Sequence, residues 1–190
     1  MNKGRIIGGK FKRRIIKTPK CQSTRPTSDI VKEIIFNVLI HRFHIGFSTA
    51  GVMDIFAGSG ALGIEAISLG CSNVLFVDNN LESIKCIKDN LTALNISGIA
   101  RVLQKNASCL PKDLLDTIFK KEESLVIFMD PPYSDKELLV STIEILKACV
   151  SVQENALFVI ETDEDLNIPF LEIVHKKQHG GTFVLFGKLL

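Results

Sequence analysis

Apolar positions in the body of the chain fall into short continuous runs separated by longer amphipathic stretches. The short runs, rich in Val, Ile, Leu and Phe, predict strands at residues 51–56, 73–78, 100–104, 124–130 and 156–161. The amphipathic stretches predict helices at residues 61–69, 80–94, 109–121 and 135–149. Strands joined by helices close with right-handed crossovers onto a parallel sheet. The pattern therefore predicts an α/β fold with a doubly wound, mostly parallel sheet.

The two ends of the chain carry a different pattern, in which β-rich runs flank a pair of glycines. Near the start, "RIIGGKFKRRIIK" predicts a short hairpin that turns at Gly8-Gly9. Near the end, "LEIVHKKQHGGTFVLFGKL" predicts an antiparallel hairpin at a sheet edge. We therefore expect residues 1–24 to form a hairpin extension and residues 25–190 to form the main domain.

Between the first hairpin and the body, "STRPTSDIVKEIIFNVL" carries the signals of a helix start. Thr27 or Ser28 can cap the helix, and Asp29 suits its first turn. The spacing of Ile30 and Val38 predicts that they lie on the face that packs against the core.

Composition is that of a globular protein with a sizeable core: 190 residues, 46% hydrophobic and 23% charged. No apolar run reaches the roughly 18 residues that span a bilayer. The start, "MNKGRIIGGKFKRR", lacks the apolar core of a signal peptide, so we expect a cytoplasmic protein. The five cysteines are scattered without a CxxC pair, which favours free thiols over a metal site or a disulfide framework.

Basic residues concentrate at the start of the chain. Residues 1–28 hold nine of the 23 Lys and Arg residues and no acid, which leaves 14 basic against 21 acidic residues elsewhere. A basic extension on an acidic body indicates a polyanionic partner. A solvated charged edge is the simpler alternative, but the apolar residues interleaved with the basic ones favour a hairpin that binds nucleic acid. The candidate contacts are Arg5, Lys10, Lys12, Arg13 and Arg14.

A glycine-rich segment, "GVMDIFAGSGALGIEA", lies where the first strand of the body meets its helix. Gly58 and Gly60 allow a sharp turn and a close approach of a ligand to the backbone. Asp54 precedes the glycines and would repel a dinucleotide pyrophosphate, but it suits an ammonium group. A tight turn without a ligand is the alternative for this segment alone.

The next two strands also end in polar residues. Asp78 ends "NVLFVD" and can accept hydrogen bonds from ribose hydroxyls, although a helix cap is the alternative. Asn106 and Ala107 follow the third strand and could flank an adenine, unless they form a simple loop. An adenosine with a cationic amino-acid tail matches both acids and the glycines, and that ligand is S-adenosylmethionine.

The stretch "LVIFMDPPY" ends a buried strand with an acid, two prolines and an aromatic residue. Asp130 and the Pro131 carbonyl can accept hydrogen bonds from both N–H groups of a planar amine. Tyr133 can stack on a base, and such stacking is worth about 1–3 kcal/mol. An exocyclic base amine is a poor nucleophile because its lone pair is delocalised, so catalysis would come mostly from positioning. A strand followed by a proline turn is the local alternative.

Taken together, "DIFAGSGALGIEA", Asp78 and "DPPY" resemble the motifs of S-adenosylmethionine-dependent amino-methyltransferases with the class I, Rossmann-like fold. With "RIIGGKFKRRII" and "RPTSDIVKEIIFNVL", the chain resembles the 16S rRNA guanine-N2 methyltransferase family (RsmD) over about residues 4–187. The resemblance implies a seven-stranded sheet and methylation of guanine 966 of 16S rRNA. The expected partner is 16S rRNA in the 30S subunit or an assembly intermediate, and the expected state is a monomer.

The resemblance also implies roles for individual residues. Asp130, Pro131, Pro132 and Tyr133 would hold the flipped guanine, and no metal is implied. The implied cofactor contacts are Arg25, Thr27, Asp54, Phe56, Ala57, Gly58, Gly60, Asp78, Asn79, Asn106 and Ala107.

Four alternatives remain at this point. A DNA adenine-N6 or protein glutamine-N5 methyltransferase would share the acceptor motif, but the first usually needs a recognition insertion and the second typically has Asn at position 130. A non-catalytic RNA-binding assembly factor would not need the intact acids. An NAD-dependent dehydrogenase is disfavoured by Asp54 and by the glycine spacing.

Overall fold

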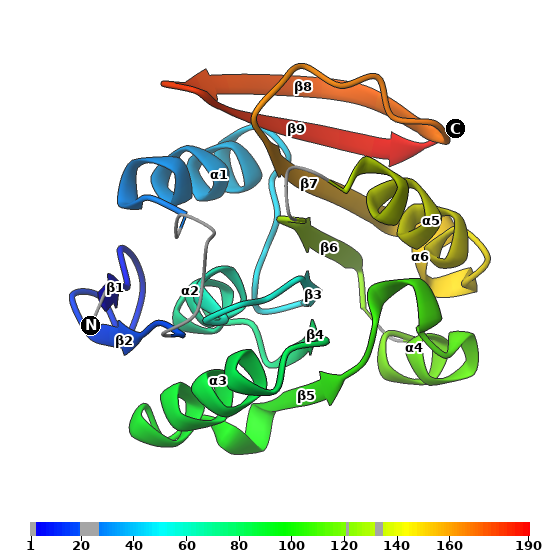
Figure 1. Cartoon of the computed structure of the whole chain (residues 1–190). Coiled ribbons are helices and arrows are strands. Elements are labelled where there is room, and N and C mark those ends of the chain that lie inside the picture. Colours follow the sequence, from blue (N-terminus) through cyan, green and yellow to red (C-terminus); the bar gives the residue numbers. More distant parts are fainter. Residues whose placement is uncertain (1–2, 20–26, 121, 132–134) are drawn as a thin grey trace.

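The computed structural model describes residues 3–19, 27–120, 122–131 and 135–190. In these residues a seven-stranded sheet has the strand order β5-β4-β3-β6-β7-β9-β8 (Figure 1). The first five strands are parallel to one another, and the last two form an antiparallel hairpin at one edge. The strands are β3 (Ala50–Ile55), β4 (Asn73–Asp78), β5 (Ala100–Gln104), β6 (Ser124–Met129), β7 (Ala156–Thr162), β8 (Leu171–His179) and β9 (Thr182–Leu189). The predicted sheet and terminal hairpin are confirmed.

Helices cover both faces of the sheet (Figure 1). One face carries α1 (Asp29–His41), α2 (Ala61–Ser68) and α3 (Leu81–Ala93). The other carries α4 (Lys112–Ile118), α5 (Lys136–Leu146) and α6 (Val150–Asn155). Short 3₁₀ turns occur at η1 (Ser97–Ile99) and η2 (Ala107–Cys109).

Alternating side chains of the central strands fill two separate cores. Val52, Phe76, Phe128 and Val159 belong to the core under α1–α3, and their chain neighbours Met53, Val77, Ile127 and Ile160 belong to the core under α4–α6. Successive side chains of a strand point to opposite faces, so a strand buried on both faces reads as a continuous apolar run. This is why the five runs could be identified as strands.

Two predicted helices have different bounds in the structure. Of the described residues in the stretch 109–121, only Lys112–Ile118 forms an α-helix (α4); Cys109 is the last residue of η2, and Pro111 between the two is extended. Proline has no N–H to donate and restricts the residue before it, so a helix cannot run through position 111. The predicted helix at 135–149 ends at Leu146, and α6 follows it as a separate helix that the apolar pattern did not indicate.

Helix α1 begins as predicted, and its predicted core-facing side is confirmed only in part. The Ser28 hydroxyl accepts a hydrogen bond from Val31 N at 3.2 Å, so Ser28 is the cap. Val38 is buried as predicted, but Ile30 is 51% exposed, and the buried face includes Val31 and Lys32. The ammonium of Lys32 donates to the Arg5 carbonyl and lies 3.1 Å from an Asp29 carboxylate oxygen. A buried lysine therefore ties α1 to the start of the chain.

The predicted N-terminal hairpin is present, with a wider turn than expected. Strands β1 (Lys3–Arg5) and β2 (Ile15–Lys17) pair antiparallel, and Ile6 and Arg14 extend the pairing toward the loop. Gly9 has a φ of 68°, and a Cβ there would lie 1.9 Å from the Ser68 carbonyl oxygen. Gly9 is thus required for close contact with α2 rather than for a two-residue turn.

The hairpin is held on the main domain by side chains of α2 and α3. The buried Glu65 carboxylate accepts hydrogen bonds from Ile7 N at 3.0 Å and Gly8 N at 2.6 Å. The Asn90 amide accepts from Lys17 N at 2.8 Å and donates to the Lys17 carbonyl at 3.0 Å. These bonds satisfy backbone groups of the hairpin that would otherwise lose water without a partner.

We expect Glu65→Ala to loosen the hairpin, because two backbone N–H groups lose their acceptor. The free energy of unfolding should fall by about 1–3 kcal/mol, and hydrogen exchange at Ile7 and Gly8 should accelerate. Glu144→Ala is the matched control: Glu144 is exposed on α5, and its loss should change stability by less than about 0.5 kcal/mol. Equal stability of the two variants in urea unfolding would contradict the anchoring role of Glu65.

Candidate functional site

Four acidic residues on neighbouring strands face the same side of the sheet. Asp54, Asp78, Asp130 and Glu161 continue the alternating positions that face α1–α3 on β3, β4, β6 and β7. The register pairs Ile55 with both Val77 and Met129, and Met129 with Ile160. Asp78, Asp130 and Glu161 therefore lie at one level at the carboxyl edge of the sheet. Asp54 lies two residues further from that edge, at the level of Phe76 and Phe128. We call these four residues the strand-end acids.

Asp54 is buried beneath the start of α2. It is 3% exposed, and its Oδ2 accepts a hydrogen bond from Gly63 N at 2.8 Å. Burial raises the pKa of Asp54 to about 7, the Gly63 hydrogen bond opposes that rise, and the charge of Asp78 adds to it. A Cβ on Gly63 would lie 2.3 Å from the Phe76 ring, so only glycine lets α2 approach this closely.

The segment from Phe56 to Gly60, the glycine loop, has a sharply turned backbone. Phe56, Gly58 and Gly60 have φ values of 64°, 53° and 76°. Glycine adopts this left-handed conformation without strain, and Phe56 does not. The predicted sharp turn at the two glycines is confirmed, and it lies at the end of β3.

Asp78 holds the glycine loop rather than capping the next helix. Its Oδ2 accepts from Gly58 N at 2.8 Å and its Oδ1 from Asn80 N at 2.8 Å. The cap of α3 is Asn80, whose Oδ1 accepts from Glu82 N at 2.7 Å. Each carboxylate oxygen keeps a second lone pair, so Asp78 can still accept hydrogen bonds from a ligand. Asn79 is exposed beside it.

The residues proposed near an adenine divide into exposed and buried ones. Asn106 is exposed, and its Oδ1 accepts from Ser108 N at 3.1 Å and Ser108 Oγ at 3.0 Å, which caps η2. Its amide nitrogen donates to no other described residue. Ala57 and Ala107 are buried, at 8% and 4% exposure, so each would meet a ligand mainly through its backbone.

Asp130 follows the last residue of β6, and buried Pro131 comes after it. Burial raises the pKa of Asp130 well above its ordinary value, and the charges of Glu161 and Asp54 raise it further. Strongly raised carboxyl pKa values are common at functional sites. Pro132, Tyr133 and Arg25, which the sequence motifs assign to the site, lie outside the described residues.

Glu161 is a site residue that the sequence motifs did not identify. It is 5% exposed, and its Oε2 has no hydrogen-bond partner in the described part of the chain. Burial raises the pKa of Glu161, and a hydrogen bond with the Thr27 side chain opposes the rise. Thr27, assigned to the cofactor, thus contacts Glu161. The signal available in the sequence was an acid ending "ALFVIE", as acids end the strands before it.

The basic residues predicted to bind RNA are all exposed on the N-terminal hairpin. Arg5 forms an ion pair with Asp29 at 2.7 Å, whereas Lys12 and Arg13 have no carboxylate partner among the described residues. Lys12 and Arg13 also line a cavity of about 450 Å³ between the hairpin, α1 and α2. Lys10 lies over the Phe11 ring at 5.5 Å, and Arg14 Nη2 donates to the Ala93 carbonyl at 3.5 Å.

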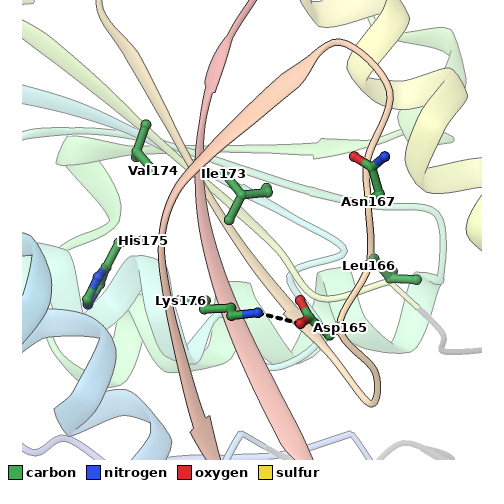
Figure 2. A pocket seen from close by; sticks show the side chains of 7 residues that line it. All are labelled: Asp165, Leu166, Asn167, Ile173, Val174, His175 and Lys176. Atoms are coloured by element: carbon green, nitrogen blue, oxygen red, sulfur yellow. Dashed lines mark hydrogen bonds and ion pairs between the residues drawn. The ribbon is translucent and has the colours of Figure 1, made fainter.

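A separate hollow of about 430 Å³ lies beside the edge strand β8 (Figure 2). It is lined by residues 165–167 and by β8, and an ion pair between Lys176 and Asp165 crosses it. None of the predicted site residues contributes to this hollow, so it is not part of the candidate site.

The described residues contain neither a metal cluster nor a membrane span. No three or more His, Cys, Asp or Glu side chains there are arranged to hold a metal ion. None of the helices described has the length and apolar character to cross a membrane. Cys71, Cys86, Cys109 and Cys149 are free thiols, as predicted, and Cys21 lies outside the described residues.

Comparison with known proteins shows similarity along nearly the whole chain. A protein of Bacillus subtilis (strain 168) named "Putative rRNA methyltransferase YlbH" is 34% identical over 97% of this chain and 98% of its own. Ribosomal RNA small subunit methyltransferase D of Escherichia coli (strain K12) is 32% identical over 87% of this chain and 77% of its own. The solved structure of hypothetical protein TTHA0928 of Thermus thermophilus is 27% identical, with a TM-score of 0.69 over 98% of this chain and 99% of its own.

The family model described as conserved hypothetical protein 95 matches residues 4–188. The predicted resemblance to the small-subunit rRNA methyltransferases and the predicted Rossmann-like methyltransferase fold are confirmed. The chain therefore belongs to the conserved hypothetical protein 95 family, as a relative of ribosomal RNA small subunit methyltransferase D.

Proposed function

We propose that this protein transfers a methyl group from S-adenosylmethionine to the exocyclic N2 amine of guanine 966 in 16S rRNA. The observation that carries the proposal is the row of strand-end acids. The glycine loop follows β3 in this row, and the Asp130-Pro131 segment follows β6. The names of the Bacillus subtilis and Escherichia coli relatives support an rRNA substrate. The protein would act as a monomer on the 30S subunit or on an assembly intermediate.

The carboxylates of the site suit a cationic cofactor. Asp54 and Asp78 place carboxylates where a pyrophosphate would be repelled and a positive charge would be stabilised. Asp78 would accept from the ribose hydroxyls, and the glycine loop would approach the cofactor through its backbone. When bound, S-adenosylmethionine supplies an electrophilic methyl group on a sulfonium. The other contacts would come from Asn79, Asn106, Ala107, Thr27 and Arg25.

Asp130 and Pro131 would orient the amine that accepts the methyl group. The Asp130 carboxylate and the Pro131 carbonyl would each accept a hydrogen bond from one of its two N–H groups. The nitrogen lone pair is then free to point at the methyl group. Pro132 would stiffen the turn, and Tyr133 would stack on the base. The base must leave its stack to reach a strand edge. Positioning and electrostatics supply most of the rate enhancement in such a transfer.

The N-terminal hairpin would grip the RNA backbone. Its exposed Lys12 and Arg13 lack carboxylate partners in the described residues, so binding phosphate would break no ion pair there. The hydrogen bonds of Glu65 and Asn90 hold the hairpin on α2 and α3, the helices beside the glycine loop. The rigid placement sets a fixed distance between the phosphate contacts and the strand-end acids.

The proposal is tested by incubating the protein with labelled S-adenosylmethionine and either 16S rRNA or 30S particles, followed by mass spectrometry of the nucleosides. We expect label in N2-methylguanosine. Label in N6-methyladenosine, or label that stays in the protein fraction of the 30S particles on a glutamine, would assign the site to another amino-methyltransferase. Absence of label with every substrate would favour a non-catalytic assembly factor.

We expect Asp130→Ala to abolish methyl transfer and to leave S-adenosylmethionine binding nearly unchanged, because Asp130 would contact the amine. Turnover is measured by label incorporation and cofactor affinity by calorimetry. Asp135→Ala is the control, since Asp135 caps α5 on the other face of the sheet. Near-normal turnover by Asp130→Ala would exclude its proposed role.

Cofactor affinity should rise with pH. Asp54 has a raised pKa of about 7, and a cationic ligand favours its ionised form, so binding releases a proton below that pH. The association constant should rise about tenfold from pH 6 to pH 8. Calorimetry in buffers of different ionisation enthalpy would count the protons. Asp54→Asn should release about one proton fewer at pH 6; an unchanged proton count would show that another group titrates.

Replacing Lys12, Arg13 and Arg14 with Ala should weaken RNA binding and reduce the slope of log affinity against log salt by about 2, because phosphate contacts release counterions. Cofactor affinity should not change. The control removes Lys112, Lys177 and Lys188, which are exposed outside the hairpin and carry the same total charge. Equal salt slopes for the two triple variants would show that the hairpin does not bind RNA.

A further inference from the structure

Of the four strand-end acids, Glu161 alone has no role in the proposed function. It is 5% exposed, and its Oε2 lacks a hydrogen-bond partner in the described residues. Buried polar atoms without partners are rare, and each calls for a physical explanation. A side chain of any apolar type would avoid this loss of solvation, so a ligand that donates a hydrogen bond to Oε2 is the simplest reason for a carboxylate here.

The position of Glu161 indicates which ligand it meets. Met129 pairs with Ile160, so Asp130 and Glu161 follow at the same level on adjacent strands and face the same side. Adjacent strands are about 4.8 Å apart. The Thr27 side chain interacts with the Glu161 carboxylate and opposes the rise in its pKa, whereas Oε2 has no hydrogen-bond partner among the described residues. Oε2 is therefore the acceptor that Glu161 can still offer on the strand next to Asp130.

The Watson–Crick edge of guanine matches this arrangement of acceptors. Its N2 amine and its N1–H are neighbouring donors, so two carboxylates side by side can bind both. Adenine offers a lone pair at N1 beside its amine, and that lone pair would face a carboxylate oxygen. A site built to accept a hydrogen bond rejects analogues that lack the donor, because a buried acceptor is then left unpaired.

We propose that Glu161 is a specificity residue of the acceptor site, whose Oε2 accepts the N1–H of the target guanine while Asp130 holds the N2 amine. This inference rests on the proposed function. Thr27 is a positioning residue, which acts by orienting the Glu161 carboxylate. Guanine would then be selected by two neighbouring carboxylates, those of Asp130 and Glu161. This selection would not depend on the RNA contacts made by the hairpin.

The test uses reconstituted small subunits that carry either guanine or 2-aminopurine at the target position. 2-Aminopurine has the same N2 amine but a lone pair at N1, so it isolates the contact with Glu161. The wild-type protein should prefer guanine by at least about 100-fold in kcat/KM. Glu161→Gln presents an amide that can donate to N1 or accept from N1–H, so it should reduce the preference at least tenfold.

The ratio of the two kcat/KM values is the decisive measurement, because effects on cofactor binding or on the fraction of folded enzyme cancel in it. If Glu161→Gln does not fold, Thr27→Val keeps the carboxylate and should still reduce the preference by releasing its orientation. A preference that is the same in wild type and in the folded variants would overturn the inference and leave the proposed function intact. Failure of the wild-type protein to methylate guanine would overturn both.

Discussion

The in-register parallel pairing of β4, β3, β6 and β7 is the constraint on which the candidate site depends. Each strand alternates between two cores, and a shift of one residue in any of them would turn its acid to the opposite face. Phe76, Phe128 and Val159 are buried two positions before Asp78, Asp130 and Glu161. The apolar core therefore fixes the register, and the register aligns the acids.

The strands, the parallel character of the sheet and most helices were predictable from the sequence because their physical causes are local. Strands buried on both faces give continuous apolar runs, and the glycine pair near the C-terminus marks a hairpin. The face of α1 was predicted only in part: Val38 is buried, but Ile30 is exposed and Lys32 is buried, because Lys32 bonds a carbonyl that is distant in sequence. Hydrophobicity alone does not reveal a polar side chain whose partner comes from another element.

The same limit applies to the candidate site. Asp54, Asp78 and Asp130 were identified because each stands beside a glycine or proline motif or at a clear strand end. Glu161 has no such motif, and its importance depends on the neighbouring strand and on the lack of a partner for Oε2. Glu65 was likewise missed, since the backbone groups that it binds lie nearly sixty residues earlier. Pairings across such distances need the folded chain.

Asn90 gives the two parts of the proposed site a common support. Its amide nitrogen donates both to the Lys17 carbonyl of the hairpin and to the Ser59 carbonyl of the glycine loop, each at 3.0 Å. One planar group thus holds the proposed RNA-binding segment and the proposed cofactor-binding segment in a single geometry. Linkage between two binding events is reciprocal. RNA bound at the proposed hairpin surface and cofactor bound at the proposed glycine-loop surface would therefore change each other's affinity by the same factor, to the extent that either one moves Asn90.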